Sequence, residues 1–192
     1  SMQEISQRLL PPYRDAVHEG VGAVMVSFNS CSDINMHAHK VLISDTLKKG
    51  MGFNGMVVTD WKGYSRFGYN DIINAGVDMV MAVEGDLDIF QTQLKIAVQN
   101  GSVSQARVDD AVRRILRQKF RLNLFENPFP DSSLIAKIGC DSHREKARQA
   151  VRESMVLLKN DHDALPIDKN LEKIVVVGEH ADNTGFQSGG WS

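Results

Sequence analysis

Short apolar runs alternate along the chain with longer stretches in which apolar positions recur every three or four residues. The runs at residues 22–28, 55–60 and 77–82 have the length and apolar content of buried strands. Helices are predicted at about residues 11–20, 37–49, 69–75, 87–99 and 104–120. This alternation of strands and helices predicts an α/β fold whose strands run parallel.

One carboxylate, that of Asp60, lies at the end of a predicted strand. In GMVVTDWKGY, Asp60 follows the apolar run that ends at Val58, with only Thr59 between them. Parallel strands joined by right-handed crossovers bring their C-terminal ends to one edge, and ligands bind at that edge in barrels and open sheets. We therefore expect Phe28, Asp60 and Ala82 at one edge, where Asp60 is either functional or caps a loop.

A receiver domain offers another explanation for an aspartate after an apolar strand. Its phospho-acceptor aspartate occupies a comparable position in a flavodoxin-like fold. Such a domain also carries an acidic pair at an earlier strand end, and no such pair precedes Asp60 in the sequence. The pattern alone does not separate a catalytic carboxylate from a loop cap.

The composition changes in residues 122–140, where Pro128 and Pro130 interrupt any regular pattern. We expect a linker there, between a first domain at residues 1–121 and a second at residues 141–192. A helix from about Ser142 and a strand in KIVVVGEHAD predict the start of a further α/β unit. Because the sequence stops before that unit can bury its faces, we expect the second domain to be truncated.

Charge and cysteine content exclude several classes of function. The chain has 22 Lys and Arg against 24 Asp and Glu, mixed along its length, which does not favour nucleic acid or an anionic membrane. No apolar run approaches the roughly 20 residues of a spanning helix, and no leader segment is evident. Cys31 and Cys140 lie far apart and form no paired motif. His37 and His39 have an H-x-H spacing but fall at a helix start, so we expect neither metal nor cofactor.

The segment GFNGMVVTDWKGYSR resembles the nucleophile segment of glycoside hydrolase family three, approximately GFxGxVxSDW. MHAHKVLISDTLK, INAGVDMVMA, VDDAVRRILRQKFRLNLFENP and GEHADNTGFQSGGW resemble successive parts of that family, in order. The resemblance covers nearly the whole chain and is closest to the β-glucan exohydrolase type. It implies the C-terminal part of a (β/α)8 TIM-type barrel, about three β/α units, then the linker and the first elements of an α/β sandwich domain.

The resemblance also implies roles for individual residues. Asp60 corresponds to the nucleophile of a retaining β-glycosidase, and Trp61 beside it offers an apolar face to a sugar ring. Arg66 would hold a sugar hydroxyl or keep Asp60 ionised. The remaining matched residues are Met25 and Phe28 near the glucose site, and Trp191, the first of the aromatics that clamp the next sugar. The family often has tyrosine at the position of Phe28, so one hydroxyl is missing here.

The implied activity is hydrolysis of terminal β-D-glucosyl residues from β-glucosides or β-glucan oligosaccharides by double displacement. In the family the acid/base glutamate arises further downstream, so we expect the isolated chain to be inactive and the incomplete barrel to self-associate. The family's usual setting is secreted, periplasmic or in the cell wall. A non-catalytic α/β module that binds a carbohydrate or a protein partner is the alternative.

Overall fold

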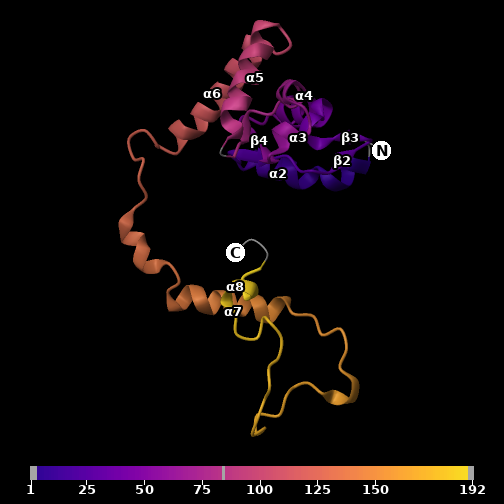
Figure 1. Ribbon diagram of the computed structural model, residues 1–192, viewed down its shortest axis with the longest axis vertical. Helices are drawn as coiled ribbons and strands as arrows, with labels where there is room; N and C mark the ends of the chain where they lie inside the picture. The colour runs from indigo at the N-terminus through magenta and orange to yellow at the C-terminus, as the bar shows by residue number, and fades with distance from the viewer. Residues whose placement is uncertain (1–3, 84, 190–192) are drawn as a thin grey trace. The chain divides into compact units, whose positions relative to one another are not determined.

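The computed structural model describes residues 4–83 and 85–189, and Trp191 therefore lies outside the described residues. The chain forms two compact units, one ending at Pro130 and the other beginning at Asp131 (Figure 1). This division falls inside the stretch 122–140 that the sequence predicts to be a linker. The two units are described separately.

A three-stranded parallel sheet forms the centre of the first unit. Its strands are β1 (Ala23–Met25), β4 (Met56–Trp61) and β5 (Met79–Met81), in the order β1-β4-β5. Both strand pairs are parallel, which confirms the prediction of a parallel α/β fold. The outer strands are shorter than predicted, whereas β4 pairs on both sides and extends one residue beyond Asp60.

Helices precede and connect these strands, together with a small hairpin of β2 (Ser30–Cys31) and β3 (Ile34–Asn35). The helices of this unit are η1 (Ile5–Leu9), α2 (Pro11–His18), η2 (Met36–Ala38), η3 (Val41–Gly50), α3 (Gly63–Arg66), α4 (Tyr69–Ala75), α5 (Asp86–Gln99) and α6 (Gln105–Arg121). The hydroxyl of Ser104 caps α6 by accepting from the amide of Arg107 at 3.2 Å, as the sequence indicates.

The helix predicted at 37–49 is interrupted, and this part of the prediction is wrong. His39 has φ −84° and ψ 77°, outside the helical region, and separates η2 from η3. Its Nδ1 accepts a hydrogen bond from the amide of Leu42 at 3.3 Å, which satisfies a donor in the first turn of η3. This break changes the direction of the chain between the edge of the sheet and η3.

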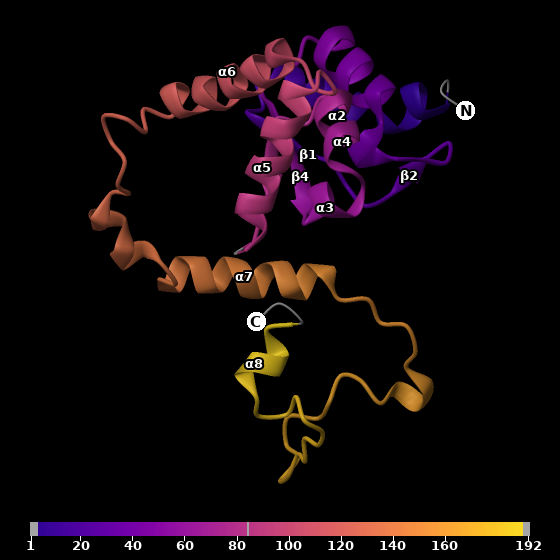
Figure 2. The ribbon, with the colours of Figure 1, turned by 45° about the horizontal axis from the view of Figure 1, so that its top comes forward.

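The hydrophobic core lies on one face of the sheet. Val57 and Thr59 of β4 are fully buried there, and Figure 2 shows α4, α5 and α6 beside strands β1 and β4. The opposite face is open, since Met25 and Met79 are 53% and 43% exposed. Both methionines pair with Val58, so this open face is also the one that carries Val58.

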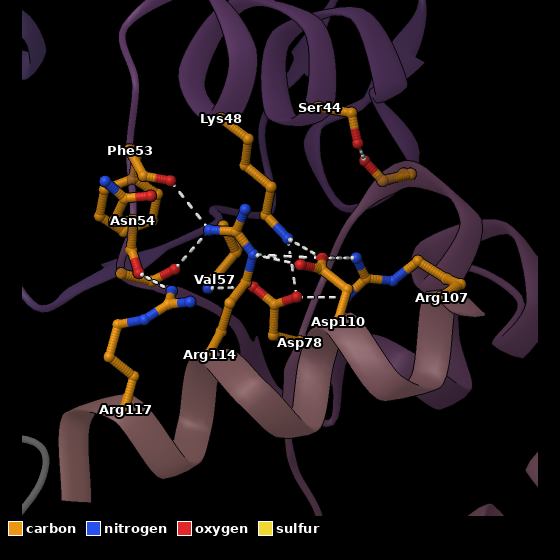
Figure 3. A network of polar contacts seen from close by, with 12 residues as sticks. Ser44, Lys48, Phe53, Asn54, Val57, Asp78, Arg107, Asp110, Arg114 and Arg117 are labelled. Carbon is orange, nitrogen blue, oxygen red and sulfur yellow. Dashed lines mark hydrogen bonds and ion pairs between the residues drawn. The ribbon is translucent and has the colours of Figure 1, made fainter. Parts of the chain in front are cut away.

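A buried ionic network closes the N-terminal edge of the sheet, opposite the edge that carries Asp60 (Figure 3). Asp78, just before β5, accepts from Lys48 Nζ at 2.7 Å and from the amide of Val57 at 2.8 Å. Arg107 of α6 also donates to this carboxylate. Because an unpaired buried charge is costly, these contacts hold η3, α6 and two strands in one arrangement.

Arg114 extends the network along α6. Its Nη1 donates to the carbonyl oxygens of Phe53 and Gly55, at 2.8 and 2.9 Å, just before β4 begins. Its Nε donates to both carboxylate oxygens of Asp110 at 3.1 Å. The helix that follows the sheet in sequence therefore fixes the start of the central strand.

The second unit contains helical elements. They are η4 (Ser132–Lys137), α7 (Asp141–Ser154), η5 (Asp161–Asp163) and α8 (Thr184–Gln187), of which α7 is the longest. The strand predicted in KIVVVGEHAD is not formed, and Ile174 to Val177 are 62 to 84% exposed. A strand needs a neighbour for its backbone hydrogen bonds, and this segment pairs with none of the described residues.

None of the described helices combines the length and the apolar content that crossing a membrane requires.

Candidate functional site

Asp60 lies at the C-terminal end of β4, one residue before the strand ends, and is half-buried. Its Oδ1 accepts a hydrogen bond from the amide of Trp61 at 2.6 Å. The chain then turns through Lys62, which has φ 54° and immediately precedes α3. A non-glycine residue in this left-handed region is uncommon, and such residues cluster at functional turns.

An irregularity in the β4–β5 pairing sets the position of Asp60. Val58 pairs with Met79 and Trp61 with Met81, so β4 has one extra residue between the two pairs. The hydroxyl of Thr59 accepts the amide of Met81 at 2.8 Å, replacing a backbone ladder bond. A bulge of this kind bends a strand and redirects a side chain, and bulges are frequent beside active sites. The bulge therefore places Asp60 and Trp61 at the C-terminal edge of the sheet.

His37 supports the backbone of Asp60 from the neighbouring loop. The Asp60 amide donates to His37 Nε2 at 3.0 Å, and His37 Nδ1 lies 3.2 Å from Oδ1 of Asn35. Burial lowers the pKa of His37, although the negative charge of Asp60 acts in the opposite direction. The imidazole is fully buried, so it can shape the site without touching a ligand in solvent.

Aromatic side chains gather beside this support. The Phe28 and Phe67 rings lie 5.5 and 4.9 Å from the His37 ring, measured between centroids. The Arg66 guanidinium stacks over both phenyl rings, 5.2 Å from the centroid of Phe28 and 5.8 Å from that of Phe67. Arg66 is exposed and forms no ion pair with Asp60 among the described contacts. The predicted hydroxyl contact of Arg66 stays compatible with this position.

The structure brings together most of the residues that the sequence singles out. Met25 pairs with Val58, two residues before Asp60, and its side chain shares the open face. Phe28 is 38% exposed in the loop after β1, and Trp61 is 56% exposed directly after Asp60. A carboxylate between exposed apolar side chains suits a ligand with both hydroxyl groups and an apolar face.

Three residues of this arrangement were not selected from the sequence. Asn35 orients His37, Phe67 stacks on it, and Gly63 leaves it room, because a Cβ on Gly63 would lie only 2.2 Å from His37 Nε2. Asn35 had a usable signal, since asparagine before a helical turn is a preferred N-cap. Phe67 and Gly63 had none, because their partner lies in a distant segment of the sequence.

The buried histidines do not belong to a metal centre in the described part of the chain. His39 caps η3 and His37 supports Asp60. No three His, Cys, Asp or Glu side chains among residues 4–83 and 85–189 come together in a group that could hold a metal ion.

Comparison with known proteins shows the family of this chain. The sequence profile of the glycosyl hydrolase family 3 N-terminal domain matches residues 1–118. The periplasmic β-glucosidase of Salmonella typhimurium is 33% identical over the whole of this chain, which spans 27% of that protein. The chain therefore corresponds to about a quarter of this curated relative.

Solved structures agree with the sequence match. A variant exo-1,3/1,4-β-glucanase from a Pseudoalteromonas species is 36% identical, with a TM-score of 0.75 over 87% of this chain and 28% of its own. A variant β-glucosidase from Listeria innocua, solved with laminaribiose, is 31% identical, with a TM-score of 0.71 over 88% of this chain and 25% of its own. The chain belongs to glycosyl hydrolase family 3 and carries the family's N-terminal domain match in residues 1–118.

Proposed function

We propose that this chain is the nucleophile-bearing part of a retaining β-glycosidase that removes terminal β-D-glucosyl residues from β-glucosides or β-glucan oligosaccharides. The observation that carries the proposal is the placement of Asp60. Its carboxylate stands at the bulged C-terminal end of the central parallel strand, with Trp61 beside it and Phe28 on the neighbouring loop. Relatives named β-glucosidase and exo-β-glucanase support the substrate class.

The reaction begins when a carboxylate oxygen of Asp60 attacks the anomeric carbon of the bound glucosyl unit. The glycosidic bond breaks, its oxygen leaves with a proton from a general acid, and a glycosyl ester of Asp60 remains. Water then attacks the same carbon, loses a proton to the group that acted as acid, and releases glucose and the free carboxylate. A carboxylate suits this role because it is ionised at neutral pH.

The other site residues would bind the sugar. Trp61 and Phe28 present apolar surface to the pyranose ring, and Arg66 on top of Phe28 presents N–H groups to a hydroxyl. Met25 would pack below the ring at the open sheet face, and we assign Trp191 to the following sugar unit. Since Phe28 has no hydroxyl, the polar contact that a tyrosine would make falls to Arg66 or to water.

The chain matches only part of its relatives, and the remaining functions are assigned to segments beyond the match. We propose that residues 1–121 belong to a (β/α)8 barrel, that 122–140 link it to a second domain, and that 141–192 open an α/β sandwich. The general acid would come from further along that second domain. The named periplasmic relative supports a setting outside the cytosol.

A hybrid enzyme tests this proposal. The matching segment of the Pseudoalteromonas exo-1,3/1,4-β-glucanase is replaced by this chain, and hydrolysis of 4-nitrophenyl β-glucoside is measured. We expect activity, and we expect Asp60→Ala to lower kcat by orders of magnitude. A folded hybrid without activity, or an Asp60→Ala hybrid within a few fold of its parent, would contradict the proposal.

Rescue by azide identifies the role of Asp60. In the Asp60→Ala hybrid, azide replaces the missing nucleophile and attacks once, giving the glucosyl azide of α configuration. If Asp60 were instead the acid/base, azide would attack a glycosyl-enzyme intermediate and give the β product. The anomeric configuration of the product, determined by NMR, decides between the two.

A non-catalytic module that binds a carbohydrate is the second candidate, favoured by the exposed aromatic surface next to Asp60. It predicts that the hybrid binds laminaribiose without hydrolysing 4-nitrophenyl β-glucoside, and that its Asp60→Ala variant binds laminaribiose equally well.

A further inference from the structure

The loop between β1 and η3 holds a chain of hydrogen bonds that ends at the candidate nucleophile. Asn35 Nδ2 donates to the carbonyl oxygen of Phe28 at 3.2 Å. Asn35 Oδ1 accepts the amide of His37 at 2.9 Å and lies 3.2 Å from His37 Nδ1. His37 Nε2 accepts the amide of Asp60 at 3.0 Å. Two segments of the site, at Phe28 and Asp60, are therefore joined through Asn35 and His37.

These contacts require one particular form of the imidazole. A backbone amide is only a donor, so His37 Nε2 must carry a lone pair rather than a proton. The proton of a neutral imidazole then sits on Nδ1, where the amide oxygen of Asn35 accepts it. A protonated His37 would set an N–H against the N–H of Asp60 and break the contact.

Packing holds the ring in this orientation. His37 is fully buried, Phe67 stacks on it at 28° between the ring planes, and Phe28 lies near it with its ring plane tilted by 33°. Gly63 faces Nε2 so closely that any side chain there would displace the ring. Asp60 is the charged group whose field acts on the imidazole, and burial outweighs that field in lowering the pKa of His37.

We propose that His37, oriented by Asn35, is a positioning residue for the nucleophile: its neutral Nδ1–H tautomer anchors the Asp60 amide and so sets the direction of the Asp60 carboxylate. The inference rests on the proposed role of Asp60. His37 does not touch substrate and exchanges no proton with it. The carboxylate follows the backbone because its Oδ1 also bonds to the next amide, at Trp61.

The tautomer is tested on the chain itself, without any activity. Histidine labelled with ¹⁵N is incorporated, and long-range ¹H–¹⁵N correlation spectra are recorded at neutral pH. We expect His37 to show a protonated Nδ1 and an unprotonated Nε2, with the signal identified from its absence in His37→Gln. A protonated Nε2 would overturn the inference whether or not Asp60 is a nucleophile.

Two substitutions separate the anchoring role from packing alone. Glutamine at position 37 keeps an acceptor at about the reach of Nε2, whereas leucine fills similar space without one. We expect hydrogen exchange at the Asp60 amide to stay slow in His37→Gln and to accelerate at least about tenfold in His37→Leu, relative to the amide of Val57 in the same strand. Equal exchange in the two variants would contradict the anchor.

In the hybrid enzyme, His37→Leu should lower kcat by about 10- to 100-fold with little change in KM, because a misplaced reacting group costs rate more than binding. His37→Gln should retain most of the parent kcat. If both variants lose activity equally, or if His37→Leu stays within about twofold of the parent, the positioning role is wrong. An inactive unsubstituted hybrid would count against the proposed function. The spectra and the exchange rates would still test whether His37 anchors the Asp60 amide.

Discussion

The hydroxyl of Thr59 accepts a hydrogen bond from the backbone amide of Met81 at 2.8 Å. This contact lies at the bulge of β4, where its pairing with β5 is irregular. A side chain thus supplies the acceptor that the irregular ladder does not, one residue before Asp60. Replacing Thr59 with valine should leave the Met81 amide without this partner and lower the free energy of unfolding by about 1–3 kcal/mol.

Serine provides the matched control for this substitution, since Thr59→Ser keeps the hydroxyl and loses only a buried methyl group. Hydrogen exchange at the Met81 amide should be fast in Thr59→Val and slow in Thr59→Ser. Protection of that amide in both variants would mean that the hydroxyl is not its acceptor.

The buried ionic network makes stability depend on pH. Burial lowers the pKa of Lys48 from 10.5 to about 8, despite the opposing charge of Asp78. Between these values the unfolded chain binds more protons than the folded chain, so the contribution of Lys48 to stability rises with pH. We expect the free energy of unfolding to increase, relative to a Lys48→Met variant, by on the order of 2 kcal/mol from about pH 7 to about pH 9.5.

Urea denaturation of both proteins across this interval checks the prediction. The upper end of this pH interval stays below the range in which Tyr64 titrates, because burial raises the pKa of Tyr64 to about 12. A difference between the two proteins that stays constant or shrinks as pH rises would show that Lys48 keeps its ordinary pKa.

The isolated chain should not hydrolyse β-glucosides at a useful rate. General acid–base assistance is typically worth about 100- to 10,000-fold, and the resemblance places the acid beyond the segments matched here. The chain is incubated with 4-nitrophenyl β-glucoside and a short β-glucan, with Asp60→Ala in parallel to reveal any host glucosidase. Sustained turnover that disappears in Asp60→Ala would show that a group in this chain, or in a second copy, acts as the acid.

The isolated chain should also self-associate. In the order β1-β4-β5, both outer strands offer unpaired backbone groups, and the open face exposes Met25 and Met79. Light scattering should report species larger than a monomer, and Met79→Lys should shift them toward the monomer by placing a charge on that face. A compact monomer of the unsubstituted chain at all concentrations would be the contrary result.

Much of the first unit follows from local patterns. Apolar runs located all three parallel strands, Ser104 marked the start of α6, and the position of Asp60 after a buried strand indicated a sheet-edge carboxylate. These features depend on residues that are close in sequence. The strand predicted in KIVVVGEHAD is wrong for the complementary reason, because a β-branched run becomes a strand only when another strand is present to pair with it.

The sequence by itself determined the parallel α/β architecture, the family and the carboxylate to which a function can be assigned, since periodicity, caps and motif spacing are local properties. Tertiary structure alone decided how that carboxylate is held. The bulge opposite Met81, the anchor from His37 and the stacking of Arg66 on Phe28 each join segments that are distant in sequence. Such contacts depend on register, ring orientation and available space, which exist only once the strands and loops have packed together.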